Sequence, residues 1–260
     1  MPKSVKNNVP EQHVLSSIND MCTVLHMSGF KYRLAEVVDD PTWLTLTMPE
    51  QLRDLLSAEL SKREINAIAR LRRNSNLPHE LLHATYNELY DSHERKLDPK
   101  LLTLIKEGSW MLKEAPADLV LSGACGVGKS YLAACCVNFM VDRRNSAYFI
   151  RAGRLLTDLH LHRLNNTIEK RKQELKKIGL LVLDDFLIDD VNEADCADLL
   201  DIINDRNRLK PTIYTSQFKI EGWLDRLGNT PLSQAVLDRI NHSSFKLHIE
   251  GPSQRPTVSL

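Results

Sequence analysis

Residues 118–137 read DLVLSGACGVGKSYLAACCV, and this stretch decides the fold of the chain. An apolar run at 118–122 enters a glycine-rich turn, and a helical pattern leaves it. Residues 123–130 satisfy the motif G-x-x-x-x-G-K-[ST] in full, with a strand expected before the turn and a helix after it. In this context the motif predicts a loop that binds the phosphates of a nucleotide.

The motif needs each of its residue types for a physical reason. Glycines let the backbone turn tightly and bring its N–H groups against phosphate oxygens, and the helix adds the positive end of its dipole. We expect Lys129 to reach the β- and γ-phosphates of ATP and the Ser130 hydroxyl to ligate Mg²⁺. The expected nucleotide contacts are Gly123, Ala124, Cys125, Gly126, Val127, Gly128, Lys129, Ser130 and Tyr131.

An acidic pair ends another apolar run, GLLVLDDF at residues 179–186. Asp184 and Asp185 fall at the carboxyl end of the expected strand, where ligands of open α/β sheets bind. We expect Asp184 to hold Mg²⁺, directly or through water, and Asp185 to orient or deprotonate the attacking water. Because the carboxylate of Asp185 is one methylene shorter than that of a glutamate, whether it supports fast hydrolysis stays open.

Five apolar runs alternate with helical segments from residue 118 to residue 250. This alternation predicts a parallel five-stranded sheet covered by helices on both faces. The run at 146–151 is expected to lie between the two motif strands, an arrangement that favours an NTP hydrolase over a small-molecule kinase. The run at 211–216 leads into Gln217, and Gln217 or Ser216 is expected to sense the γ-phosphate.

The first 110 residues have a different, helical texture. The predicted helices cover about residues 14–25, 32–38, 48–73 and 99–108, and Thr47 with Glu50 forms a capping box before the third. We therefore predict a small helical domain at 1–110, for contacts with DNA, partners or other subunits. An ATPase domain is predicted at 111–260.

The chain has no net charge, since Lys+Arg and Asp+Glu both total 34. A long-range basic field is thereby excluded, and any DNA contact must come from a local patch. A solvated helix face is the alternative explanation for such a patch. The candidate DNA-binding residues are Lys62, Arg63, Arg70, Arg72 and Arg73.

The cysteine pattern and the apolar runs bear on the compartment. Five cysteines without a CxxC pair argue against a disulfide framework or a zinc ribbon and for a reducing compartment. No run approaches the roughly 20 apolar residues that span a bilayer, and the polar start lacks the apolar core of a signal peptide. We expect a cytoplasmic protein with no membrane partner.

Taken together, these motifs resemble the IstB-like helper ATPases of bacterial insertion sequences, AAA+ relatives of the DnaC helicase loaders and the DnaA initiator. The resemblance covers nearly the whole chain, and the ordered combination of Asp-Asp, Thr-Ser-Gln and Leu-Asp-Arg-Ile is its specific part. The matching stretches are residues 56–74, 108–133, 180–186, 212–218, 228–240 and 245–255.

The resemblance implies an ATP-dependent helper of transposition. Such proteins assemble as homo-oligomers on duplex DNA, remodel it, and cooperate with a cognate transposase in target selection and strand transfer. By the same resemblance Arg239 occupies the arginine-finger position and would reach the γ-phosphate of a neighbouring subunit. The alternative for Arg239 is a surface cation paired with Asp238 or Asp225. The C-terminal helical lid of AAA+ proteins is expected to be missing or nearly so, which leaves Arg255 as the one late candidate for a sensor arginine.

Three other functions stay open at this point. A DnaC-like loader of a replicative helicase would share the same ATPase core and differ in what the helical region binds. A small-molecule kinase would turn over ATP regardless of DNA. A nucleotide-switched binding module would hardly hydrolyse ATP at all.

Overall fold

The computed structural model describes residues 9–86 and 97–254. The chain divides into two compact units, Met1–Ala69 and Arg70–Leu260, and the boundary lies inside helix α4 (Met48–Asn74). Residues 70–110 thus belong to the second unit. The division of functions between residues 1–110 and 111–260 stays a prediction.

The first unit consists of helices α1 (Val9–Val24), α2 (Ser28–Val37), α3 (Pro41–Leu44) and the first part of α4, around a small apolar core. Helix α2 begins at Ser28, four residues before its predicted start. The carboxylate of Glu59 in α4 explains this, because it accepts hydrogen bonds from the backbone N–H groups of Gly29 (2.8 Å) and Phe30 (3.2 Å). These are donors of the first turn that a helix cannot satisfy by itself. A cap from a residue thirty positions away leaves no trace in the local pattern.

Gly29 lets α2 approach α4 closely, and we predict that Gly29→Ala destabilises the first unit by about 2 kcal/mol. A Cβ on Gly29 would lie 2.7 Å from the carbonyl oxygen of Ala58 and 2.8 Å from Cα of Glu59, both backbone atoms that cannot rotate away. Urea denaturation measures the effect, with Ser28→Ala at the neighbouring exposed position as control. Equal midpoints for the two variants would contradict this close approach.

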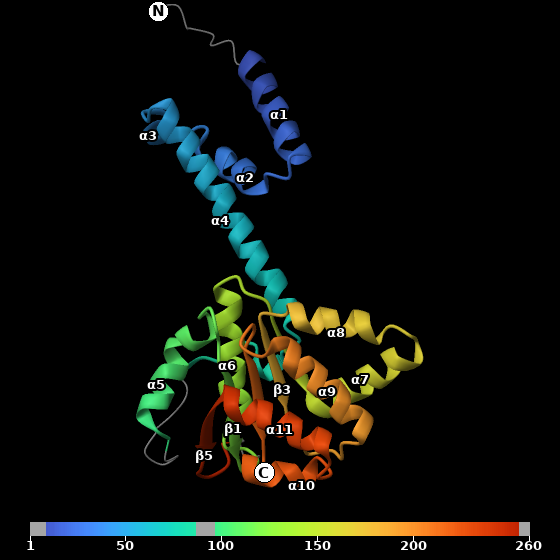
Figure 1. Ribbon diagram of the computed structural model, residues 1–260. Coiled ribbons are helices and arrows are strands. Elements are labelled where there is room, and N and C mark those ends of the chain that lie inside the picture. The colour runs from blue at the N-terminus through green and yellow to red at the C-terminus, as the bar shows by residue number, and fades with distance from the viewer. Residues whose placement is uncertain (1–8, 87–96, 255–260) are drawn as a thin grey trace, which may run out of the picture. The chain divides into compact units, whose positions relative to one another are not determined.

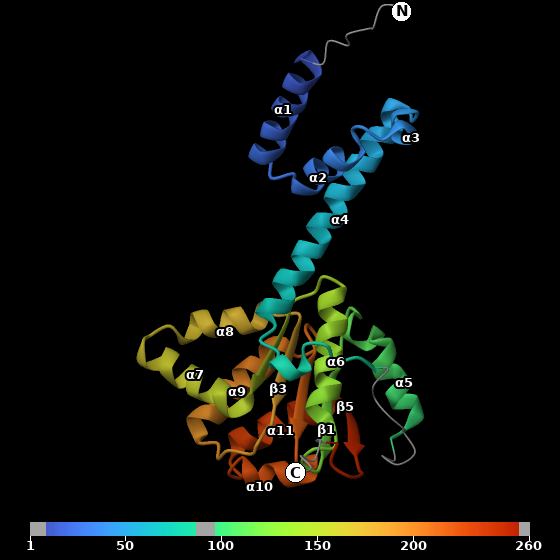
Figure 2. The same cartoon turned by 180° about the vertical axis from the view of Figure 1, so that it is seen from behind.

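The second unit is a three-layer α/β/α structure (Figures 1 and 2). All neighbouring strands of its sheet are parallel, in the order β2-β3-β4-β1-β5. The parallel five-stranded sheet predicted from the sequence is thus confirmed. Its strands are β1 (Asp118–Gly123), β2 (Ala147–Arg151), β3 (Leu180–Asp184), β4 (Thr212–Ser216) and β5 (Ser244–Ile249).

Helices cover both faces of this sheet. α9 and α11 lie in front of the strands in Figure 1, whereas α6 comes forward in Figure 2. The helices are α5 (Pro99–Glu107), α6 (Lys129–Asp142), α7 (Ala152–Leu164), α8 (Ile168–Lys177), α9 (Glu193–Arg206), α10 (Trp223–Arg226) and α11 (Pro231–Ser243). The described part of the unit also contains the short 3₁₀ turns η1 (His79–Leu81), η3 (Ser109–Met111) and η4 (Ile220–Gly222). None of the helices in the described part of the chain is both long and apolar enough to cross a bilayer.

The predicted place of the strand at 146–151 is wrong. This strand is β2, which lies at the edge of the sheet, and β4 lies between β1 and β3. The register pairs β4 with both neighbours, Leu121 opposite Thr215 and Leu183 opposite Tyr214. The two motifs are therefore still separated by one strand. That strand is β4, so its carboxyl end enters the middle of the site.

A buried carboxylate links elements at the amino-terminal ends of the strands, the end of the sheet opposite the phosphate loop. Asp118, the first residue of β1, accepts hydrogen bonds from the N–H of Thr212 (2.7 Å) and the hydroxyl of Ser243 (2.9 Å). Burial raises the pKa of Asp118 to about 6, against these two hydrogen bonds, which lower it. One side chain thus joins the starts of β1 and β4 to the last turn of α11.

Candidate nucleotide-binding site

The phosphate loop connects the end of β1 at Gly123 to the start of α6 at Lys129. Gly126 and Gly128 have φ angles of 83° and 98°, a left-handed backbone that glycine adopts without steric cost. The first turn of α6 follows immediately and brings the positive end of the helix dipole to the loop. The predicted order of strand, glycine-rich loop and helix is thus present.

The side chains of the loop differ in what they contact. The ammonium of Lys129, which is 6% exposed, donates to the carbonyl oxygens of Gly123 (2.8 Å) and Ala124 (2.7 Å). Cys125 is exposed, whereas Val127 is buried. The phenol oxygen of Tyr131 accepts from the N–H of Thr85 (3.1 Å), so this side chain is directed toward another segment of the unit. Of these side chains, that of Lys129 therefore lies next to the backbone that is expected to hold the phosphates.

Two hydroxyl groups converge on one oxygen of the acidic motif. The hydroxyl of Ser130 donates to Oδ1 of Asp184 (2.7 Å), and the hydroxyl of Thr215 donates to the same atom (2.6 Å). Asp184 is 5% exposed and ends β3. Serine hydroxyl and carboxylate oxygens are hard donors of the kind Mg²⁺ prefers, so Ser130 and Asp184 fit this cation.

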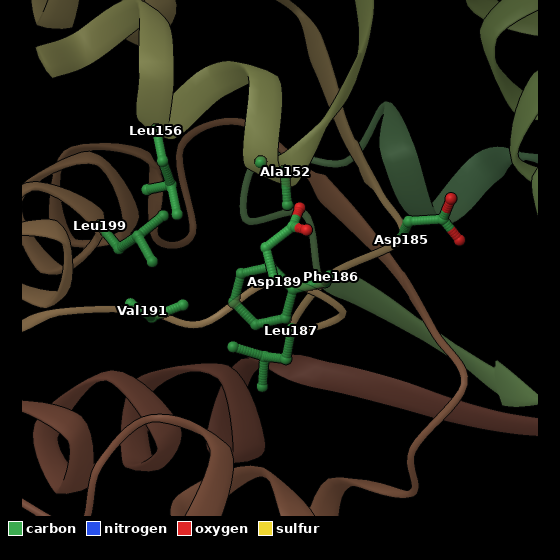
Figure 3. A pocket seen from close by; sticks show the side chains of 9 residues that line it. Ala152, Leu156, Asp185, Phe186, Leu187, Asp189, Val191 and Leu199 are labelled. Atoms are coloured by element: carbon green, nitrogen blue, oxygen red, sulfur yellow. The ribbon is translucent and has the colours of Figure 1, made fainter.

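Asp185 follows directly in a left-handed conformation, with a φ of 56°. Its N–H donates to the hydroxyl of Thr215 (3.0 Å), and the N–H of Phe186 donates to the Thr215 carbonyl (2.7 Å). In Figure 3 the Asp185 carboxylate points away from the apolar pocket around Phe186 and Leu187. The left-handed backbone at Asp185 therefore orients its carboxylate independently of the Asp184 carboxylate.

The apolar side chains that line the pocket in Figure 3 hold the turn that carries Asp184 and Asp185. The side chains of Phe186 and Leu187 are 1% and 2% exposed, and the Phe186 ring packs against Tyr214 and Trp223 with centroids 5.3 and 5.0 Å apart. Because the two residues that follow Asp185 are fixed in the core, the turn that carries both carboxylates is held in place.

Thr215 is the residue of this site that the sequence analysis missed. It favoured Ser216 or Gln217, but the Ser216 hydroxyl donates to the Phe186 carbonyl (2.8 Å) and accepts from the N–H of Phe218 (3.2 Å). Gln217 is exposed just beyond the end of β4. Thr215 instead contacts both acidic residues, because β4 lies next to β3. No local sequence signal identifies Thr215, because its contacts depend on the order of the strands.

Arg239 lies in α11 and is exposed, and its Nε donates to Oδ1 of Asn204 in α9 (2.9 Å). The predicted alternative was a pair with Asp238 or Asp225. Asp238 pairs with His242 instead, at 3.1 Å. Arg239 therefore has a polar, uncharged partner at the surface.

Arg239 lies at the end of the sheet opposite the phosphate loop, near the amino-terminal ends of the strands. Ser244, which follows α11, pairs with Asp118 at the start of β1, whereas the loop follows Gly123 at its end. A strand of this length spans roughly 17 Å. The hydroxyl of Ser243 also joins the Arg239 carbonyl (2.8 Å) to Asp118. Arg239 thus lies near the amino-terminal ends of the strands and does not contact the nucleotide site of its own subunit.

The five basic residues proposed for DNA all lie on α4, but they are not equally available. Arg63 forms an ion pair with Glu59 (2.6 Å), and Arg72 forms one with Asp142 (2.6 Å). The exposed members are Lys62, Arg70 and Arg73, in addition to the paired Arg63. Arg255, the late candidate for a sensor arginine, lies outside the described residues.

The fold is shared with replication proteins of known structure. DnaI superposes with a TM-score of 0.58 at 21% identity, over 67% of this chain and 95% of that one. The DnaC helicase loader superposes with a TM-score of 0.54 at 21% identity, over 66% of this chain and 100% of that one. These likenesses confirm a P-loop fold of the AAA+ type for the second unit.

Sequence comparison gives relatives over nearly the whole length. The insertion sequence ATP-binding protein y4pL of Sinorhizobium fredii is 30% identical over 91% of this chain and 94% of its own. The ATP-binding protein of insertion sequence IS1162 from Pseudomonas fluorescens is 31% identical over 79% of this chain and 86% of its own. The family model of the IstB-like ATP binding proteins matches residues 22–259. The chain therefore belongs to the IstB-like ATP-binding proteins of insertion sequences, as its motifs predicted.

Proposed function

We propose that this protein is an ATPase that assembles as a homo-oligomer on duplex DNA, remodels that DNA, and assists a cognate transposase in target selection and strand transfer. Family membership supports ATP and the link to an insertion sequence. The observation that supports an oligomer is the position of Arg239, at the end of the sheet opposite the phosphate loop. An arginine there can complete the nucleotide site of another subunit and not its own.

We assign the following roles within the site, and the contacts of Lys129, Ser130 and Asp184 support them. Lys129 and the backbone amides of the loop hold the phosphates, and Ser130 and Asp184 hold Mg²⁺, which neutralises charge on the phosphate oxygens when bound. Asp185 orients or deprotonates the attacking water, and Gln217 senses the γ-phosphate at the end of β4. Arg239 of a neighbouring subunit stabilises the charge that develops as the phosphoryl group departs.

Thr215 sets the relative position of the two carboxylates, and we predict that Thr215→Val lowers kcat for ATP hydrolysis about 10- to 100-fold. Valine keeps the shape of threonine but removes the hydroxyl that bonds Asp184 and the N–H of Asp185. The Kd for ATP should change little, because the loop is untouched. Steady-state kinetics checks this, with Thr215→Ser as the conservative control that retains the hydroxyl. Wild-type kcat in the valine variant would contradict this role.

DNA binding is assigned to the exposed Lys62, Arg70 and Arg73 of α4. Each would contact a backbone phosphate, which gives affinity with little sequence preference. Three such contacts per subunit predict a slope of about −2.7 for the logarithm of the association constant against the logarithm of salt concentration. The paired Arg72 offers a matched comparison on the same helix. Its replacement should change the slope less than that of Arg70.

One experiment tests the whole proposal: the ATPase rate and the particle mass, measured with and without duplex DNA across a salt series. We expect DNA and ATP together to produce large assemblies and to raise the turnover per subunit, and both effects should disappear at high salt. A monomer that hydrolyses ATP at the same rate regardless of DNA would contradict the proposal. Pull-downs against the transposase and against a replicative helicase distinguish this function from that of a helicase loader.

A further inference from the structure

The chain segment that follows β5 contacts the phosphate loop. The N–H of Gln254 donates to the carbonyl oxygen of Gly126 in the middle of the loop (2.9 Å). A Cβ added to Gly126 would lie 2.2 Å from the hydroxyl oxygen of Ser253. At the start of the loop, a Cβ on Gly123 would lie 2.2 Å from the carbonyl oxygen of Ile249, the last residue of β5. Two glycines of the motif are thus in contact with the C-terminal part of the chain.

These contacts give the motif glycines a second reason to lack a side chain. The usual reason is the approach of phosphate to the backbone from inside the loop. Here the chain's own C-terminal part also approaches the backbone, at Gly123 and at Gly126. Gly251, with a φ of 112°, lets the chain turn from β5 toward the loop. Residues 249–254 therefore lie against the loop at two of its glycines, the first contact being part of the pairing between β1 and β5.

The hydrogen bond to Gly126 has a consequence for the inner side of the loop. A trans peptide unit is planar, and its C=O and N–H groups point in opposite directions. The carbonyl of Gly126 and the N–H of Val127 belong to one such unit. Because this carbonyl points toward the N–H of Gln254, the N–H of Val127 is held on the other side, away from Gln254. A hydrogen-bonded carbonyl also polarises the N–H of the same unit and makes it a better donor.

We propose that residues Gly251–Gln254 form a brace that orients the phosphate loop for polyphosphate binding, with Gln254 as a positioning residue that acts through its backbone N–H. The brace holds the Gly126–Val127 peptide so that the Val127 N–H faces the phosphates before the nucleotide arrives. This inference rests on the proposed function, because it assumes that ATP binds in the loop. It adds a part of the site that lies some 125 residues further along the chain than the motif.

Gln254→Pro tests the brace, because proline lacks the backbone N–H while Gln254→Ala keeps it. In the full-length protein, loss of this one hydrogen bond should weaken ATP binding about 3- to 10-fold. Gln254→Ala should bind ATP like the wild type, and adenosine, which has no phosphate, should bind both variants equally. Isothermal titration of ATP and adenosine measures these affinities. The melting temperature without nucleotide should be the same for both variants.

Several outcomes would overturn the brace. ATP affinity in Gln254→Pro equal to that of the wild type would show that the hydrogen bond does not orient the loop. Tighter ATP binding would show that the segment obstructs the site, and an equal loss for adenosine would show a general structural defect. If the wild-type protein binds no ATP, the proposed function fails together with the brace. If the wild-type protein binds ATP and Gln254→Pro binds it equally well, the brace alone fails, so the two failures are distinguishable.

Amide hydrogen exchange of the wild-type protein provides a second test that needs no variant. The N–H of Gln254 should be protected without nucleotide and should stay protected when ATP is bound. ATP should add protection at the N–H of Val127. Release of Gln254 on ATP binding would overturn the proposal, because the brace would then be leaving the loop.

Discussion

Arg239→Ala is expected to leave ATP binding unchanged and to lower the turnover of DNA-bound assemblies by about 10³- to 10⁵-fold, the range found for arginine fingers. The side chain lies at the edge of the sheet where the strands begin, so its removal leaves the phosphate loop of the same subunit intact. What the variant would lose is the cation that we propose to face the γ-phosphate of the neighbouring subunit. The measurement is kcat at saturating ATP and DNA, together with the Kd for ATP.

The control for Arg239 is Arg208→Ala. Arg208 lines the same surface pocket at the same edge and is also exposed, but no role in hydrolysis is assigned to it. A loss restricted to Arg239→Ala supports the finger, because general surface charge would be lost in both variants. If Arg239→Ala turns over ATP at the wild-type rate, the finger assignment is wrong.

Lys129→Ala is expected to lower kcat/KM for ATP by about 10²- to 10³-fold and to abolish nucleotide-dependent assembly. The ammonium is buried beside the loop, where a charge acts on the phosphates through a medium of low dielectric constant. It donates to the loop carbonyls of Gly123 and Ala124, so it lies beside the backbone that is expected to hold the phosphates. ATP titration and mass measurement with and without ATP check both effects.

The exposed Lys113 provides the matched control for Lys129. It lies in the same unit, five residues before β1, and its replacement by alanine removes the same charge without touching the loop. Lys113→Ala should assemble and bind ATP as the wild type does. A Lys129→Ala variant that still assembles in response to ATP would contradict the role given to the loop.

Features coded by adjacent residues could be predicted from the sequence. The phosphate loop and the acidic pair at the end of β3 lie where their motifs placed them, because a motif defines its own local backbone. The start and end of α5 were also correct. Asp98 caps it by accepting from the N–H of Lys100, and Gly108 ends it with a φ of 66°.

Features that depend on distant residues could not be predicted. The order of strands in the sheet is set by how each helix crosses its face, so β4 rather than β2 separates the two motifs. Thr215 became visible only with that order. The early start of α2 depends on Glu59, and the contact of Gln254 with Gly126 joins segments far apart in the chain. None of these contacts has a local pattern.

The most direct test of the shared site is a mixture of Lys129→Ala and Arg239→Ala subunits. Each variant alone should be nearly inactive, the first because it binds ATP too weakly to turn it over efficiently and does not assemble by itself, and the second because it lacks the finger. In a mixed assembly, ATP bound by an Arg239→Ala subunit can face the Arg239 of a Lys129→Ala neighbour. ATP bound by the Arg239→Ala subunits drives the mixed assembly, and random mixing in equal amounts makes at most about a quarter of the interfaces competent, so we predict that turnover rises toward a quarter of the wild-type rate. A mixture no more active than the two variants measured separately would contradict a nucleotide site completed by another subunit.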